Sequence, residues 1–366
     1  MSEPSARAML DALRPLVEAE SPSLDKACCD RAADRVASLL EQRTGASIVR
    51  HPVDRRGDHI EARIGTGTEP ILLLCHHDTV WEKGTLARLP FKVDGNRVTG
   101  PGTYDMKAGI VEAAFALEGL RAGGRPVIVL STSDEEVGST TSRTLIERLA
   151  SRASAVLVLE PAASGGAIKT ARKGIADFVL EIEGRAAHAG VEPEKGISAT
   201  EELAHQVLAL KALADPEKGT TVNVGVVNGG TRPNVVAAHA RAEIDVRFTQ
   251  ASEAQRVVFG IEGLKPRLPG AVLKLSGGLD RPPMERGPGV AQLAVLARSA
   301  ASEIGFELRE TSTGGASDGN FTAALGIPTL DGLGPDGGGA HADSEHFLID
   351  SWLARTALLR RLIESI

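Results

Sequence analysis

A set of histidine and carboxylate side chains in this sequence has the composition of a site for two divalent metal ions. Imidazole nitrogens and carboxylates bind such ions, and a two-metal hydrolase also needs a shared carboxylate and a carboxylate that serves as base. Each member lies beside a turn or at the end of an apolar run. No single member would justify the prediction of a two-metal hydrolase, but the set supplies every part. The members are His76, Asp78, Asp105, Glu135, Glu136, Glu160 and His341.

The first pair follows the apolar run 71–75, which ends in His76, His77 and Asp78. Side chains two residues apart on an extended strand point to the same side, so His76 and Asp78 share a face. A metal-bound histidine generally donates its second ring nitrogen to a carboxylate or a carbonyl, and we expect Asp78 to orient His76 in this way. His77 is expected to be an ordinary neighbour. A structural or surface role is the alternative for the pair.

The next carboxylates flank predicted helices and strands. Asp105 follows a Gly-Pro-Gly turn and precedes a predicted helix, so capping of that helix is the alternative to metal binding. Glu135 and Glu136 come directly after an apolar strand. Adjacent carboxylates repel each other and their side chains diverge, so one can bind a metal ion while the other faces a water molecule.

Glu160 and His341 are weaker candidates when each is considered alone. Glu160 ends the apolar run 155–159, and a single glutamate at a strand end is commonly a solvated surface residue. His341 lies in the glycine-rich segment 337–345, which indicates a backbone that passes close to another group. The alternative interpretation is that the glycine run only makes the segment around His341 flexible.

The elements that must position these residues follow an α/β pattern. Helix-period segments alternate with short apolar runs in the first half of the chain, which is typical of a sheet covered by helices. Active sites of open α/β sheets lie at the carboxyl ends of the strands, where the candidate ligands fall. The predicted helices are near 5–19, 25–43 and 107–122, and the predicted strands are near 59–64, 70–76, 126–132 and 154–159.

From about residue 174 the order changes to strand, helix, strand, strand, helix, strand, which is typical of a ferredoxin-like βαββαβ unit with its own core. After Pro282 and Pro283 the α/β pattern resumes. We therefore predict a catalytic metal-binding domain at 1–173 and 284–366, with an inserted domain at 174–283. The predicted strands are 174–183, 221–228, 239–248, 271–276 and 307–312, and the helices are 198–213, 250–263, 287–304 and one from about 349.

The composition excludes several classes of protein. With 366 residues, of which 42% are hydrophobic, the chain can fill two cores. A formal charge of -7 without a long basic run argues against a nucleic-acid partner. The three cysteines lack the spacing of a disulfide framework, which suits a reducing compartment. The first twenty residues lack a signal-peptide centre and no apolar run reaches bilayer length, so we expect a cytoplasmic protein without a membrane partner.

Five ordered blocks of the sequence resemble the signature blocks of the M20 metallopeptidases, most closely the glutamate carboxypeptidase branch. The resemblance spans essentially the whole chain, and the order of the blocks makes a chance match improbable. It implies a zinc-peptidase-like α/β catalytic domain with an inserted ferredoxin-like lid or dimerisation domain. The blocks are 76–80, 100–109, 133–139, 159–161 and 341–345.

The resemblance also implies a role for each candidate residue around two zinc ions per chain. Asp105 would bridge the ions, with His76 and Glu160 completing one site and Glu136 and His341 the other. Glu135 would be the general base, and Asp78 would orient His76. Cobalt or manganese are alternatives to zinc, because histidine and carboxylate ligands accept them as well.

The inserted domain carries a second resemblance, in the block 184–190 that contains His188. In this branch the matching histidine reaches the active site of the partner subunit and stabilises the oxyanion, which implies a homodimer. Asn234 matches a substrate-binding asparagine, and Arg247 and Arg281 fall near positions that recognise the substrate. Surface ion pairs are the alternative for both arginines. No basic residue matches the lysine by which glutamate-specific members recognise the substrate side chain, since Ala167 falls nearer that position than Lys169.

The predicted function is a di-zinc hydrolase that cleaves the amide bond of a small peptide or an N-acyl amino acid with a free carboxylate. The alternative within the family is a deacylase of the acetylornithine or succinyl-diaminopimelate type. A non-catalytic binding protein would require a lost ligand or base, and none is lost. A nucleophilic serine is not supported, because Ser131, Ser133 and Ser139 around the glutamate pair lack a suitably spaced histidine. A nucleotide site is not supported either, because the glycine-rich segments lack a P-loop lysine and a Gly-x-Gly-x-x-Gly fingerprint between a strand and a helix.

Overall fold

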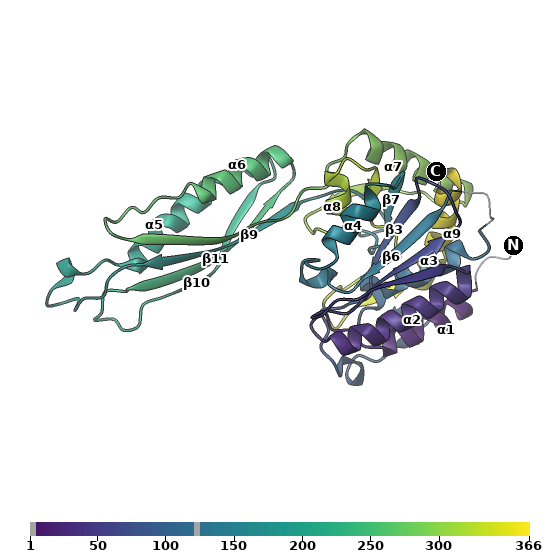
Figure 1. Cartoon of the computed structure of the whole chain (residues 1–366), viewed down its shortest axis with the longest axis horizontal. Helices are drawn as coiled ribbons and strands as arrows, with labels where there is room; N and C mark the ends of the chain where they lie inside the picture. Colours follow the sequence, from purple (N-terminus) through teal and green to yellow (C-terminus); the bar gives the residue numbers. More distant parts are fainter. Residues whose placement is uncertain (1–4, 121–124) are drawn as a thin grey trace. The chain divides into compact units, whose positions relative to one another are not determined.

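The computed structural model describes residues 5–120 and 125–366, which form two compact units (Figure 1). Unit 1 comprises the chain up to Ala171 together with Glu285–Thr313 and Ser317–Ile366. Unit 2 comprises Arg172–Met284 and Gly314–Ala316. Because the chain leaves unit 1 and returns to it, unit 2 is an insertion in the sequence of unit 1.

The centre of unit 1 is a six-stranded sheet with the order β1-β2-β6-β3-β7-β14. Strands β6, β3, β7 and β14 run parallel to one another, whereas β2 is antiparallel to both β1 and β6. The carboxyl ends of the parallel strands therefore meet at one edge of the sheet. The strands are β1 (Ser47–His51), β2 (His59–Ile64), β3 (Ile71–His76), β6 (Val127–Thr132), β7 (Ala155–Val158) and β14 (Thr329–Leu330).

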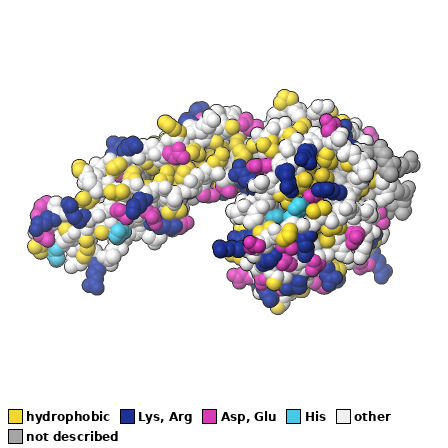
Figure 2. Space-filling model, viewed as in Figure 1, with side chains coloured by type: hydrophobic (Ala, Val, Ile, Leu, Met, Phe, Trp, Pro, Cys, Tyr) yellow, Lys and Arg dark blue, Asp and Glu magenta, His cyan; other side chains and the backbone are white. Residues whose placement is uncertain are grey.

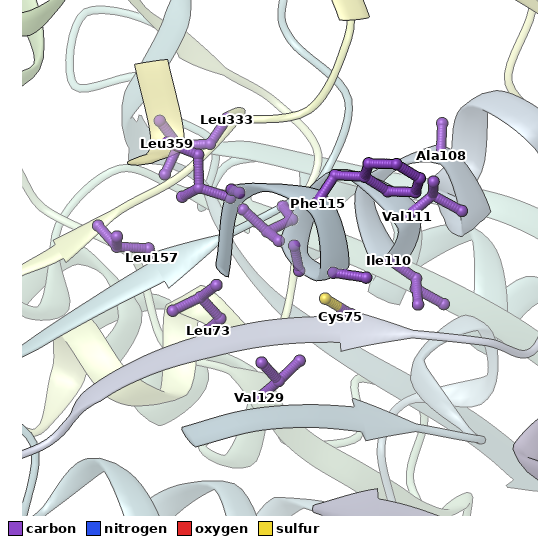
Figure 3. Close-up of a cluster of buried hydrophobic side chains, with 14 of the residues drawn as sticks. Leu73, Cys75, Ala108, Ile110, Val111, Phe115, Val129, Leu157, Leu333 and Leu359 are labelled. Carbon is purple, nitrogen blue, oxygen red and sulfur yellow. The ribbon is translucent and has the colours of Figure 1, made fainter. Parts of the chain in front are cut away.

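Helices cover both faces of this sheet. Leu73 and Cys75 of β3 face one hydrophobic cluster, which includes side chains of α1, α2, α3, α7 and α9 and is drawn in part in Figure 3. Leu72 and Leu74 face the opposite cluster, to which α4 and α8 contribute. A strand that is buried on both faces has a continuous apolar sequence, and β3 is such a strand. The helices are α1 (Ala6–Glu18), α2 (Lys26–Thr44), α3 (Ala108–Leu117), α4 (Arg143–Ala150), α7 (Pro288–Glu303), α8 (Gly319–Ala324) and α9 (Ile349–Ser365).

Local sequence signals set the bounds of these helices. The Asp25 side chain accepts a hydrogen bond from the backbone N–H of Cys28 at the start of α2, and Gly45 ends that helix with a left-handed φ of 67°. The helix predicted near 107–122 is shorter in the structure, because α3 ends at Leu117 and Gly119 then takes a left-handed φ of 69°. Residues 121–124 of that prediction lie outside the described part of the chain.

Two small sheets complete unit 1. One has the order β15-β16-β5-β4, in which β16 pairs with β5 and so brings the segment before β16 beside the segment after β5. The other pairs β8 with β13. The strands are β4 (Lys92–Asp94), β5 (Arg97–Thr99), β8 (Ile168–Arg172), β13 (Glu310–Thr313), β15 (Gly337–Gly338) and β16 (His346–Leu348).

Unit 2 is a four-stranded antiparallel sheet with the order β10-β11-β9-β12. Alternate side chains of β9 and β11, such as Phe178 and Ile244, are buried in a separate core to which α5 and α6 contribute. The βαββαβ order confirms the fold class predicted from the sequence. The elements are β9 (Gly174–Glu183), α5 (Ala199–Lys211), β10 (Thr221–Gly229), β11 (His239–Phe248), α6 (Ala251–Glu262) and β12 (Val272–Arg281).

The surface of the molecule carries charges of both signs. Basic and acidic side chains are interspersed over the face shown in Figure 2. Within residues 5–120 and 125–366, no helix is long and apolar enough to cross a membrane.

Candidate metal centre

The candidate ligands meet because β3 lies between β6 and β7 and runs parallel to both. His76 is the last residue of β3. Glu135 and Glu136 lie in a single 3₁₀ turn that follows β6, and Glu160 comes two residues after the end of β7. Adjacent parallel strands thus deliver one histidine and three carboxylates to the same edge of the sheet.

Asp105 and His341 reach this edge through the small sheet. Because β16 pairs with β5, the loop that contains His341 lies beside the loop that leads to Asp105. The Oδ1 atom of Asp105 lies 3.4 Å from Nε2 of His76, and its Oδ2 atom lies 3.3 Å from Nε2 of His341. The two oxygens of one carboxylate therefore face two different imidazoles. Asp105 does not cap the following helix, since the N-cap of α3 is Lys107 without a capping side-chain bond.

Each imidazole also faces a carboxylate of its own. Oε1 of Glu160 lies 3.5 Å from Nε2 of His76, and Oε2 of Glu136 lies 3.2 Å from Nε2 of His341. The five side chains thus form two half-sites that share Asp105. In addition, one candidate ligand atom each from His76, Glu135 and Glu160 lie within 4.8 Å of one another.

Three atoms of this cluster are buried without a hydrogen-bond partner among the described residues: Nε2 of His76, Oδ1 of Asp105 and Oε1 of Glu136. A buried polar atom without a partner costs about 1–3 kcal/mol. Divalent cations would satisfy all three atoms, since each is a lone-pair donor of a type that zinc accepts. The residues present therefore fit two metal ions with one bridging carboxylate.

Asp78 contacts several of the candidate residues and holds them in position. Nδ1 of His76 lies 3.1 Å from the carbonyl oxygen of Asp78, which can only accept a hydrogen bond, so Nδ1 carries a proton and Nε2 is left as the nitrogen that can bind a metal ion. The Asp78 carboxylate accepts hydrogen bonds from the backbone N–H groups of Glu135 and Glu136, both at 3.2 Å, and from the hydroxyl of Ser23 at 2.7 Å. Asp78 thus fixes His76 through its carbonyl oxygen and both glutamates through its buried carboxylate.

Comparison with known proteins decides the family. Residues 72–365 match the model of peptidase family M20/M25/M40. The chain belongs to this family. The family and the class of enzyme predicted from the sequence, a metallopeptidase or related amidohydrolase, are therefore confirmed.

Two relatives of this M20 chain indicate the range of the family. Carboxypeptidase G2 of Pseudomonas sp. (strain RS-16) is 33% identical over 308 residues, which cover 82% of this chain and 74% of that protein. Succinyl-diaminopimelate desuccinylase of Dechloromonas aromatica (strain RCB) is 29% identical over 374 residues, covering 93% and 94%. The relatives thus include both a carboxypeptidase and a deacylase.

Solved structures share the fold at low identity. The aminopeptidase PepT of Bacillus cereus ATCC 10987 has a TM-score of 0.80 at 21% identity, covering 98% of both chains. The YXEP protein of Bacillus subtilis, described as a dinuclear metal-binding peptidase of the M20 family, has a TM-score of 0.70 at 18% identity, again covering 98% of both chains. At these identities the likeness shows that the fold is shared.

Glu345 contacts the segment that carries Asp105 in this M20 chain, although the sequence assigned it no role. Its fully buried carboxylate accepts backbone N–H bonds from Gly102 at 3.1 Å, Tyr104 at 2.9 Å and Asp105 at 3.2 Å. It also accepts a bond of 2.7 Å from Nε1 of Trp81. Burial raises the pKa of Glu345 to about 7. The sequence offers one sign of its importance, which is its position four residues after His341, at the end of the block 341–345.

The charges of the centre shift its pKa values. Burial opposes the charged form of His76, but the nearby carboxylates of Asp105, Asp78 and Glu160 raise its pKa well above the usual value. The carboxylates of Asp105 and Glu136 raise the pKa of His341 to about 10. The carboxylates therefore favour the charged form of both imidazoles in the metal-free protein, so that metal ions compete with protons for this site.

The other predicted residues lie in unit 2. His188 and Asn234 are exposed neighbours, since the backbone N–H of Ala189 donates to the carbonyl of Asn234 at 3.0 Å. The guanidinium of Arg247 donates to the carboxylate of Asp245 on its own strand, with a shortest distance of 2.7 Å. Arg281 is buried at the end of β12. The catalytic and substrate-binding roles of these residues stay predictions.

Proposed function

We propose that this protein is a two-metal amidohydrolase that cleaves the amide bond of a small peptide or an N-acyl amino acid with a free carboxylate. The observation that carries the proposal is the position of Asp105, whose two oxygens lie 3.4 Å and 3.3 Å from the imidazoles of two half-sites. A carboxylate in this position suits a bridge between two ions. Zinc is the proposed metal, with cobalt or manganese as alternatives.

The proposed ligands divide between two ions. His76, Glu160 and Asp105 would hold one ion, and His341, Glu136 and Asp105 would hold the other. When bound, such a pair of ions polarises the amide carbonyl and lowers the pKa of a water molecule between them. The protein supplies the geometry, because Asp78 and Glu345 fix the segments that carry the ligands.

Glu135 is the proposed general base. Its backbone N–H is held by Asp78 at 3.2 Å, and one of its carboxylate oxygens lies within 4.8 Å of ligand atoms of His76 and Glu160. From there Glu135 would take a proton from the attacking water and deliver it to the leaving nitrogen, which needs no covalent intermediate.

Unit 2 is the proposed source of substrate contacts. The planar fork of an arginine suits a carboxylate, so Arg247 and Arg281 are proposed to bind the free carboxylate of the substrate, together with Asn234. To bind the substrate, the guanidinium of Arg247 would have to release the carboxylate of Asp245 or donate to both carboxylates at once. His188 is proposed to stabilise the oxyanion that forms during amide hydrolysis. Its side chain is exposed and is therefore accessible to a second protomer.

A deacylase of the succinyl-diaminopimelate or acetylornithine type is the second candidate, and the coverage of both chains by the desuccinylase alignment favours it. The purified, zinc-loaded protein should hydrolyse members of a panel that contains dipeptides and N-acyl amino acids. A preference for dipeptides or for N-acyl amino acids separates the two candidates. Exhaustive chelation should abolish activity, and zinc or cobalt should restore it. Full activity of a preparation shown to be free of metal would contradict the proposal.

A homodimer is proposed as the active assembly. The sheet of unit 2 has β10 and β12 at its edges, and an open edge can pair with a copy of itself around a two-fold axis. In such a dimer His188 of one protomer would act in the active site of its partner. A cytoplasmic location is proposed as well, because Cys28, Cys29 and Cys75 are all free and buried.

The role of His188 in trans has a direct test. Glu135→Gln and His188→Ala chains are each expected to be nearly inactive, and a mixed dimer contains one site with an intact base and an intact visiting histidine. Mixing the two variants should therefore restore activity, with subunit exchange shown by differently tagged chains. If subunit exchange is demonstrated and no activity returns, His188 does not act in trans. The same conclusion follows if the fully active protein sediments as a monomer.

A further inference from the structure

A groove in unit 1 opens directly beside the metal centre. Its volume is about 600 Å³, and one of its lining residues is His341, the candidate ligand that lies 3.3 Å from Asp105. Grooves of this size hold small-molecule ligands or parts of them. The segment between β3 and β5 supplies the rest of the lining: Val80, Trp81, Glu82, Lys83, Gly84, Thr85 and Arg88.

The wall of this groove is fixed to the loop that carries His341. Nε1 of Trp81 donates to Glu345 at 2.7 Å, and Arg88 forms an ion pair with Asp343. The guanidinium carbon of Arg88 lies 5.4 Å from the centroid of the Trp81 ring. Because Glu345 also holds the backbone N–H of Asp105, one carboxylate positions both the indole and the segment of the bridging ligand. The ring is therefore held in place before a substrate arrives.

The charges of the groove favour a neutral occupant. Glu82 and Lys83 carry opposite charges side by side, and the charge of Arg88 is compensated by Asp343. The half-buried Trp81 and the 43% exposed Val80 offer apolar surface. Apart from His341, the charged side chains of the wall are thus balanced, and a flat apolar group can stack on the indole or the guanidinium plane.

We propose that this groove binds the acyl portion of the substrate and that Trp81 selects a bulky, preferably aromatic, acyl group. This inference rests on the proposed amide hydrolysis and assigns the acyl side of the scissile bond to unit 1. Trp81 acts as a specificity-determining residue through direct contact. Glu345 is a positioning residue that holds the indole.

The kinetic test compares N-benzoyl and N-acetyl derivatives of one amino acid, chosen from the panel for measurable turnover. The benzoyl-to-acetyl ratio of kcat/KM should fall by about 10-fold or more in Trp81→Ala, because a ring contact is lost for one substrate only. Trp81→Phe keeps an aromatic ring and should retain most of the ratio. An equal loss for both substrates would show that the indole only supports the His341 loop, and an unchanged ratio would overturn the proposal as well.

A binding measurement separates this inference from the proposed reaction. The only other tryptophan, Trp352, is fully buried, with Nε1 bonded to the carbonyl of Ala108. In zinc-loaded Glu135→Gln protein, the N-benzoyl amino acid should change the tryptophan emission, and the added Trp81→Phe substitution should remove that response. A response without hydrolysis by the wild-type protein would refute the reaction and support the groove. Hydrolysis by the wild-type protein without any response would refute the groove alone.

Discussion

Replacement of Asp105 by alanine should remove both metal ions together. The two oxygens of this side chain lie 3.4 Å from Nε2 of His76 and 3.3 Å from Nε2 of His341, so one carboxylate faces both imidazoles. Without them each half-site retains one histidine and one carboxylate, too few for tight zinc binding at a site that normally has three protein ligands. Metal analysis after dialysis should find close to two ions in the wild-type protein and close to none in the variant. Turnover should fall by more than about 10⁴-fold, beyond the contribution of a general base.

Two further variants make this result specific. His341→Ala removes a ligand of one half-site only, so it should lower the metal content by about one ion while His76, Glu160 and Asp105 retain the other. Asp343→Ala removes an exposed carboxylate from the same loop and should leave the metal content unchanged. Retention of both ions in Asp105→Ala would show that this carboxylate is not the bridge. A protein that loses both ions in all three variants would indicate a damaged loop instead.

The candidate ligands could be picked out from the sequence because each lies beside a local signal. An apolar strand that ends in His76, or one that is followed by Glu135 and Glu136, has a carboxyl end at a known position, and parallel strands gather such ends at one edge. The sequence does not give the order of the strands. The position of β3 between β6 and β7 depends on packing over the whole sheet, and this position decides that Glu135 and Glu160 meet at His76.

Glu345 received no role because its function depends on partners far along the chain. Its carboxylate binds Trp81 and the segment from Gly102 to Asp105, which are separated from it by more than 200 residues. Only the pairing of β16 with β5, two strands of three residues each, brings these segments together. Strands this short leave no periodic pattern, so neither the sheet nor its consequence for Glu345 was predictable.

Arg247 shows a second limit of sequence reasoning. Its guanidinium suits a carboxylate, and in the structure it has one in Asp245, two residues earlier on the same strand. Residues i and i+2 share a face of a strand, so the sequence contained this pair as well as the predicted substrate contact. The residue type supports both interpretations, and a role in substrate binding for Arg247 therefore stays a prediction.

Glu135→Gln should retain both metal ions and lose turnover. The substitution keeps the size of the side chain and removes its ability to accept a proton, and a positioned base contributes about 10²- to 10⁴-fold to the rate. We expect kcat to fall within that range while KM changes little, because the amide of glutamine can still occupy the same space. Glu147→Gln is the matched control, since Glu147 lies on α4 in an ion pair with Arg143 and should not affect turnover.

Metal analysis of the same variant distinguishes a base from a ligand. Atoms of Glu135, His76 and Glu160 lie close enough together to hold an ion, so the geometry alone also permits a ligand role for Glu135. A ligand role predicts that Glu135→Gln loses an ion together with its activity, whereas Glu136→Gln would then keep both ions. A base role predicts the reverse pattern, because Glu136 is the glutamate that faces His341 at 3.2 Å. Full activity of Glu135→Gln would exclude both roles and leave the attacking water without an assigned base.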